Sequence, residues 1–78
     1  MVRQVTEQNG VQIVNTGDST SIAWMRYESD AQILSVAFRR GTGKTYEFPG
    51  ITPARFIQIK DSDSLGKTIS ALKKEMAV

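Results

Sequence analysis

Apolar and polar residues alternate with a period of two in the middle of the chain. The alternation is clearest in the run L-S-V-A-F at 34–38 and recurs at 45–48. In the run 21–27 both alternating sets are largely apolar, as in a strand that is covered on both sides. Successive side chains of a β-strand point to opposite faces of a sheet, so these runs predict three strands. Short turns separate the runs, and consecutive strands joined in this way pair as an antiparallel meander.

The first 19 residues carry a weaker pattern. Asn9-Gly10 separates two β-compatible runs, 2–8 and 11–14, and both residues tolerate the positive φ of a type I′ turn. A hairpin is expected here, with a mobile arm as the alternative. A polar, turn-rich stretch follows, N-T-G-D-S-T-S. We therefore treat residues 1–19 as an N-terminal hairpin or arm and 20–78 as the main domain.

Turn and capping residues mark a first helix. Pro49-Gly50 ends the last strand, since proline cannot donate to a sheet ladder. Thr52 can cap a helix, and Pro53 suits the first helical position because the N–H that proline lacks is not needed there. A short helix is expected over 53–60.

A second helix is expected from about Ser64 onward. Its apolar residues recur at offsets of four, three and four: Leu65, Ile69, Leu72 and Met76. Lys67, Ser70 and Lys74 fall on a different, polar face. The predicted fold class is therefore α+β: an antiparallel β-meander of three core strands plus an N-terminal hairpin, packed against two C-terminal helices.

Composition limits the chemistry that the chain can support. Its 78 residues make one small domain and include no cysteine and no histidine. Disulfides and thiolate metal sites are excluded, and the usual general base near neutral pH is missing. No apolar run is long enough for a membrane span, and the N-terminal residues lack the apolar core of a signal peptide. We expect a soluble, cytoplasmic, non-catalytic protein without metal or cofactor.

A basic cluster surrounds the turn between the second and third core strands. The net charge is only +2, so an anionic partner must be bound by local clustering. Arg39, Arg40 and Lys44 surround the run G-T-G-K-T at 41–45, which resembles the end of a P-loop but lacks its first glycine and its helix. We interpret the run as a hairpin turn. Its cations either contact a phosphate backbone or keep the turn solvated.

Two aromatic side chains have two interpretations each. Tyr46 lies in the predicted strand 45–48 and either stacks on a nucleobase or completes the core. Trp24 lies on the strand face opposite Met25 and Tyr27. It either packs beneath the N-terminal arm or contributes to an exposed patch for self-association.

The start of the second helix is a candidate anion site. Unpaired N–H groups and the helix dipole favour an anion there, and Gly66 permits its close approach. Lys67 adds a cation and Thr68 a hydroxyl, so the candidate set is Ser64, Gly66, Lys67 and Thr68. In the alternative, Asp63 or Ser64 caps the helix and Gly66 packs against Tyr46 or a neighbouring strand.

Residues distributed over about 20–75 have a characteristic order. They are Ser21-Ile22, Tyr27, Leu34, Val36, Phe38, Gly41, Tyr46, Phe48, Pro53, Phe56, Ser64, Gly66, Lys67 and Ile69. This order resembles the KTSC domain, which occurs alone in bacterial and phage-associated proteins and at the C-terminus of some lysyl-tRNA synthetases. The family's hallmark Tyr-x-Tyr corresponds to Tyr46 and Phe48, and Phe48 lacks the second hydroxyl. The synthetase context implies an RNA-binding role.

Three functions remain open from the sequence. The first is a non-catalytic module that binds nucleic acid, most simply RNA, and its candidate residues are Arg39, Arg40, Lys44, Tyr46 and Lys67. The second is a protein-interaction or homo-oligomeric assembly module that uses Trp24 and the sheet edges, as in an accessory protein of a phage or prophage. The third binds a small phosphorylated ligand at Gly66-Lys67.

Overall fold

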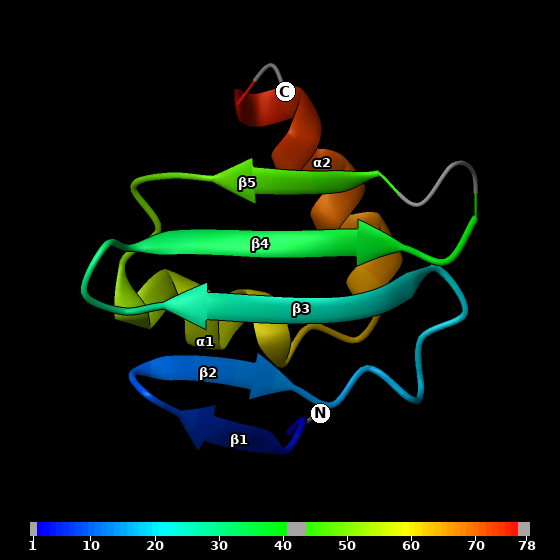
Figure 1. Ribbon diagram of the computed structural model, residues 1–78. Helices are drawn as coiled ribbons and strands as arrows, with labels where there is room; N and C mark the ends of the chain where they lie inside the picture. Colours follow the sequence, from blue (N-terminus) through cyan, green and yellow to red (C-terminus); the bar gives the residue numbers. More distant parts are fainter. Residues whose placement is uncertain (1, 41–43, 77–78) are drawn as a thin grey trace.

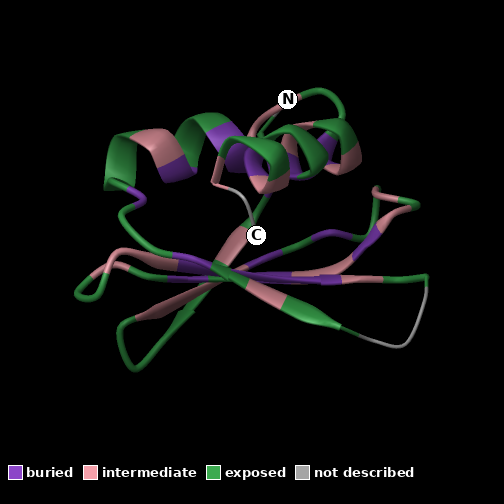
Figure 2. Ribbon diagram, turned by 90° about the horizontal axis from the view of Figure 1, so that it is seen from above, coloured by how far each residue is buried: buried purple, intermediate pink, exposed green. Residues whose placement is uncertain are grey.

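The computed structural model describes residues 2–40 and 44–76 of the chain. Its elements, in chain order, are β1 (Val5–Gln8), β2 (Val11–Val14), β3 (Ile22–Glu28), β4 (Ile33–Phe38), β5 (Thr45–Phe48), α1 (Pro53–Lys60) and α2 (Leu65–Met76). The strands form one sheet in the order β1-β2-β3-β4-β5, and every neighbouring pair is antiparallel (Figure 1). Both helices cover the same face of this sheet, and no element of the described residues covers the opposite face (Figure 2). β3 is therefore covered on one side, and the expectation of a strand covered on both sides is corrected. The predicted α+β meander with two C-terminal helices is confirmed.

The N-terminal hairpin is part of the common sheet. Asn9 and Gly10 have φ angles of 52° and 79°, the left-handed pair that a type I′ turn requires. β2 then pairs with β3, and Val14 lies opposite Met25. Of the two alternatives for this segment, the structure has the hairpin.

The core lies between the sheet and the helices. The strands contribute the buried residues Val14, Ile22, Met25, Tyr27, Leu34, Val36 and Phe48, and the helices contribute Phe56, Ile59, Leu65, Ile69 and Leu72. A β-bulge between Ile22 and Trp24 shifts the alternation of β3, so that Ile22 and Met25 are both buried although three positions separate them. Tyr27 stacks on Phe56 with ring centroids 4.3 Å apart, and this contact joins the centre of the sheet to α1.

The ends of α1 follow from its sequence. Thr52 accepts a hydrogen bond from the N–H of Arg55 at 3.2 Å, and Pro53 occupies the first helical position, as predicted. At the end of α1, the backbone N–H of Asp61 donates to the backbone carbonyls of Ile57 and Ile59. Neither helix of the described residues has the length and apolar character that crossing a membrane requires.

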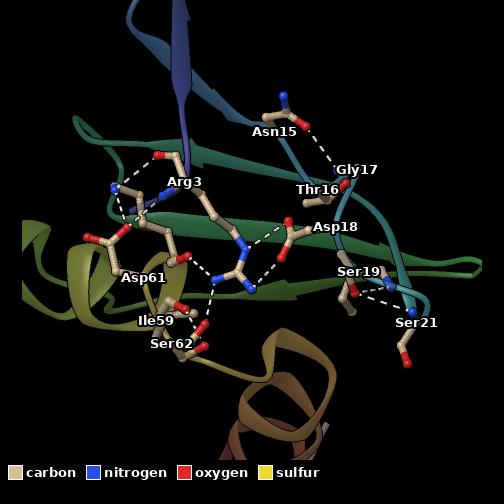
Figure 3. A network of polar contacts seen from close by, with 12 residues as sticks. Arg3, Asn15, Thr16, Gly17, Asp18, Ser19, Ser21, Ile59, Asp61 and Ser62 are labelled. Carbon is tan, nitrogen blue, oxygen red and sulfur yellow. Dashed lines mark hydrogen bonds and ion pairs between the residues drawn. The ribbon is translucent and has the colours of Figure 1, made fainter. Parts of the chain in front are cut away.

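A buried arginine ties the N-terminal segment to the end of α1 (Figure 3). Arg3 donates to both carboxylate oxygens of Asp18, at 3.2 and 2.9 Å, and to the backbone carbonyls of Lys60 and Ser62, at 2.6 and 2.5 Å. The backbone N–H of Arg3 donates to Asp61, which also accepts from the Lys60 ammonium. Each buried charge is thereby paired, as a low-dielectric environment demands. The cluster joins the chain start, the loop after β2 and the C-terminal end of α1.

These contacts lower the pKa of both carboxyl groups. The hydrogen bond from Arg3 is the main cause of the lowered pKa of Asp18. The hydrogen bond from Lys60, followed by that from the Arg3 backbone, lowers the pKa of Asp61. A carboxyl group with a lower pKa in the folded state stabilises that state above the unfolded pKa, near pH 4. This stabilisation is lost as the pH falls through the folded pKa.

We therefore expect Asp18→Asn to reduce stability at pH 7 and to weaken the loss of stability on acidification. An amide carries no charge and cannot reproduce the two-pronged contact with Arg3. Urea unfolding of the wild type, Asp18→Asn and the control Asp30→Asn at pH 7 and pH 3 measures this. Asp30 is exposed in the turn between β3 and β4, so its variant should follow the wild type. Equal pH dependence in all three proteins would contradict the interpretation.

Candidate functional site

An open groove of about 640 Å³ lies between one face of α2, the residues that follow β4, and Ser21 before β3. Its lining residues are Ser21, Phe38, Arg40, Ser64, Gly66, Lys67, Ser70, Ala71 and Lys74. We call it the α2 groove. None of its lining residues is acidic, and it combines three cations with three hydroxyl groups and one aromatic ring.

Helical spacing explains the α2 side of the groove. Ser70, Ala71 and Lys74 follow Lys67 by three, four and seven residues and therefore lie on the same helix face. The buried stripe of Leu65, Ile69 and Leu72 holds the opposite side of α2 against the sheet. The polar face that the sequence indicated is thus directed into the groove along about two helical turns.

Close contact with Ser21 fixes the start of α2. A Cβ atom at Gly66 would lie 2.9 Å from both the Cβ and the Oγ of Ser21, which is closer than real Cβ contacts. Gly66 therefore packs closely against another segment, as the second interpretation expected, and the segment is Ser21, just before β3. Gly66 also lines the groove, so the same residue serves both interpretations in part.

The aromatic side of the groove is formed by Phe38. Tyr46 packs edge-on against Phe38, with ring centroids 5.6 Å apart and an interplanar angle of 86°. The ammonium of Lys73 lies 4.2 Å from the centroid of the Tyr46 ring and 5.4 Å from that of Phe38. Tyr46 faces the helix layer and does not line the groove, so its geometry favours the core interpretation over a stacking platform. Phe48, the second hallmark position, is fully buried, where a hydroxyl would need a partner.

Arg39 supports a loop instead of joining the groove. Its guanidinium donates to the backbone carbonyls of Ser19 and Thr16, at 2.9 and 3.2 Å. Its backbone N–H donates to the backbone carbonyl of Ser21 at 2.8 Å. Of Arg39, Arg40 and Lys44, only Arg40 lines the groove. That the three act together at the hairpin tip stays a prediction. Residues 41–43 of that turn lie outside the described part of the chain.

The cations of the chain divide into two groups. All ten lysine and arginine residues lie in the described part of the chain. Six have a carbonyl, carboxylate or aromatic partner: Arg3, Arg26, Arg39, Arg55, Lys60 and Lys73. Among the described residues no such partner is found for Arg40, Lys44, Lys67 and Lys74, and all of these except Lys44 line the groove.

Two candidate sets from the sequence therefore meet in one place. Arg40 and Lys67 come from the nucleic-acid set, and Ser64, Gly66 and Lys67 come from the anion set. Thr68 is half-buried and does not line the groove. Five lining residues were absent from both sets: Ser21, Phe38, Ser70, Ala71 and Lys74. The helical spacing of Ser70 and Lys74 from Lys67 could have predicted that they share its face. Ser21 and Phe38 are distant from α2 in the sequence, and only the tertiary fold brings them to the groove.

Trp24 lies away from the groove, on the uncovered face of the sheet. It is half-buried, and the guanidinium of Arg26 lies 4.5 Å from the centroid of its ring. Its neighbour across the sheet, Ala37, is buried beside it. A role for Trp24 in an interface stays a prediction.

Gly66→Ala should lower the free energy of unfolding by roughly 1–2 kcal/mol, because overpacking at Ser21 outweighs the better helix propensity of alanine. Adding Ser21→Gly removes both clashing atoms and should restore most of the loss. Ser70→Ala, on the exposed side of the same helix, is the matched control and should be neutral or slightly stabilising. Denaturant unfolding measures all four proteins. A Gly66→Ala variant as stable as the wild type would contradict the close approach.

Comparison with known proteins identifies a family. The profile of the KTSC domain matches residues 18–70, which is more than half of the chain and includes the groove residues up to Ser70. No match was found among curated proteins or among solved structures. The described residues hold no group of three or more acidic side chains placed to bind a metal ion. The chain belongs to the KTSC domain family.

Proposed function

We propose that this chain is a non-catalytic module that binds single-stranded RNA through the α2 groove. One observation carries the proposal: Arg40, from the segment after β4, and Lys67 and Lys74, from α2, line one open groove whose lining contains no acidic residue. The other cations, apart from Lys44, contact a carbonyl, a carboxylate or an aromatic ring within the protein. The unpartnered positive charge is thereby concentrated at this groove, where it favours an anionic ligand.

The rest of the lining suits a nucleotide strand. Serine hydroxyls can hydrogen-bond to phosphate and to the ribose 2′-OH, the group that distinguishes RNA from DNA. Phe38 supplies apolar surface for an unstacked base, which only a single strand offers. Three phosphate contacts give modest, salt-dependent affinity and little sequence preference.

The salt dependence of RNA binding tests this proposal. For three phosphate contacts on a single strand, the slope of log K against log salt should be about −2, a loss of about 20-fold between 50 and 200 mM. Lys67→Ala and Lys74→Ala should each reduce the slope by about 0.7. Fluorescence anisotropy with a labelled oligouridylate measures both quantities.

Arg26→Ala is the matched control for charge, because Arg26 is exposed on the uncovered face of the sheet. It should leave the slope unchanged. A larger effect of Lys44→Ala than of Lys67→Ala would favour the hairpin tip over the groove. Absence of binding at 50 mM salt would contradict RNA binding altogether.

A second candidate function is protein–protein interaction or self-association through the uncovered face of the sheet. Trp24 and Arg26 lie together on this face, and tryptophan and arginine are enriched at interaction hot spots. It predicts a dimer whose proportion rises with concentration and which Trp24→Ala weakens at least tenfold. Light scattering over a range of protein concentrations measures this. Glu47→Ala, on the same face at the edge of the sheet, is the control and should have a smaller effect. A wild-type monomer at all concentrations would contradict self-association.

A further inference from the structure

The two lysines of the α2 groove come from the two ends of α2. Lys67 lies in the first turn of α2 and Lys74 in the last, seven residues apart, which is about 10.5 Å along the helix axis. Seven residues make almost two full turns, so both side chains leave the helix on the same side. Long lysine side chains can bend toward each other and hold two anionic groups of one ligand.

The middle of the groove is uncharged on the helix side. Ser70 and Ala71 separate the two lysines, and both are exposed. Phe38 faces the same space from the sheet, and its ring is held in place by the edge-on contact with Tyr46. A planar apolar group fits this part of the groove better than a third anion does.

Arg40 lines the groove from the side of the sheet, near the start of α2, because the preceding Arg39 donates its backbone N–H to the carbonyl of Ser21, against which Gly66 packs. α2 starts against Ser21, which leads into β3, and its last turn carries Lys73 over Tyr46 of β5. β4 lies between β3 and β5, and Arg40 follows its end (Figure 1). A guanidinium on this wall of the groove can hold a phosphate through two donors.

Resting on the proposed RNA binding, we propose that the α2 groove holds one internal nucleotide of the strand. The phosphates on its 5′ and 3′ sides lie at Lys67 and Lys74, with Arg40 donating from the opposite wall, and its base lies against Phe38 and Ala71. The smallest complete ligand is therefore a nucleoside 3′,5′-bisphosphate. A terminal monophosphate would leave one end of the groove with an unpaired lysine.

Isothermal titration calorimetry of the full chain with adenosine 3′,5′-bisphosphate, adenosine 5′-monophosphate and inorganic phosphate tests the inference. The bisphosphate should bind about tenfold more tightly than the monophosphate, because a second charged hydrogen-bonded contact is made. Lys74→Ala should lower bisphosphate affinity about tenfold, to that of the monophosphate. Arg26→Ala should change neither affinity.

A second variant tests the place of the base. Ala71→Leu adds bulk to the middle of the groove, so it should weaken both nucleotides and leave inorganic phosphate binding unchanged. Ala71 and Lys74 are exposed, so their variants should fold. Thermal unfolding of each variant is the control for this. Equal affinity for bisphosphate and monophosphate, while the labelled RNA still binds, would overturn the internal-nucleotide arrangement and leave RNA binding in place. Tight bisphosphate binding without RNA binding would overturn both proposals in favour of a small phosphorylated ligand.

Discussion

The position of α2 depends on the close approach of Gly66 to Ser21. A side chain at Gly66 would collide with Ser21, so only glycine lets the helix start directly against the residue that leads into β3. The buried stripe of α2 then crosses the sheet toward β5, where Lys73 reaches Tyr46. In this position the polar face of α2 meets the end of β4, and the α2 groove is the space between them. The candidate site is thus a consequence of one backbone contact.

The wall of the groove beside Ser21 is held by two arginines. Arg3 binds the loop after β2 through Asp18, and Arg39 binds the same loop through the carbonyls of Thr16 and Ser19. A domain of 78 residues buries a smaller fraction of its surface on folding than a larger domain does, so contacts other than apolar packing matter more. Charged hydrogen bonds, which are stronger than neutral ones, perform this role here. The fold therefore uses cations that composition alone would assign to ligand binding.

Local signals predicted most of the fold. The alternation at 34–38, the turn Asn9-Gly10 and the pair Thr52-Pro53 each act within a few residues, so the sequence displays them directly. The β-bulge between Ile22 and Trp24 could not be predicted, since alternation simply resumes in the opposite phase after it. The contacts of Arg3 with Lys60 and Ser62 were equally hidden, because any residue can offer a backbone carbonyl.

Neighbouring cations separate into different roles because the fold turns them in different directions. Lys73 and Lys74 are rotated by about 100° on the helix, so one lies over the ring of Tyr46 and the other lines the groove. Arg39 and Arg40 divide in the same way between the loop and the groove. Charge and spacing alone could not distinguish the members of either pair. The small net charge therefore understates the local field. Ion pairs neutralise Arg3, Arg55 and Lys60 in place, whereas Arg40, Lys67 and Lys74 gather beside α2.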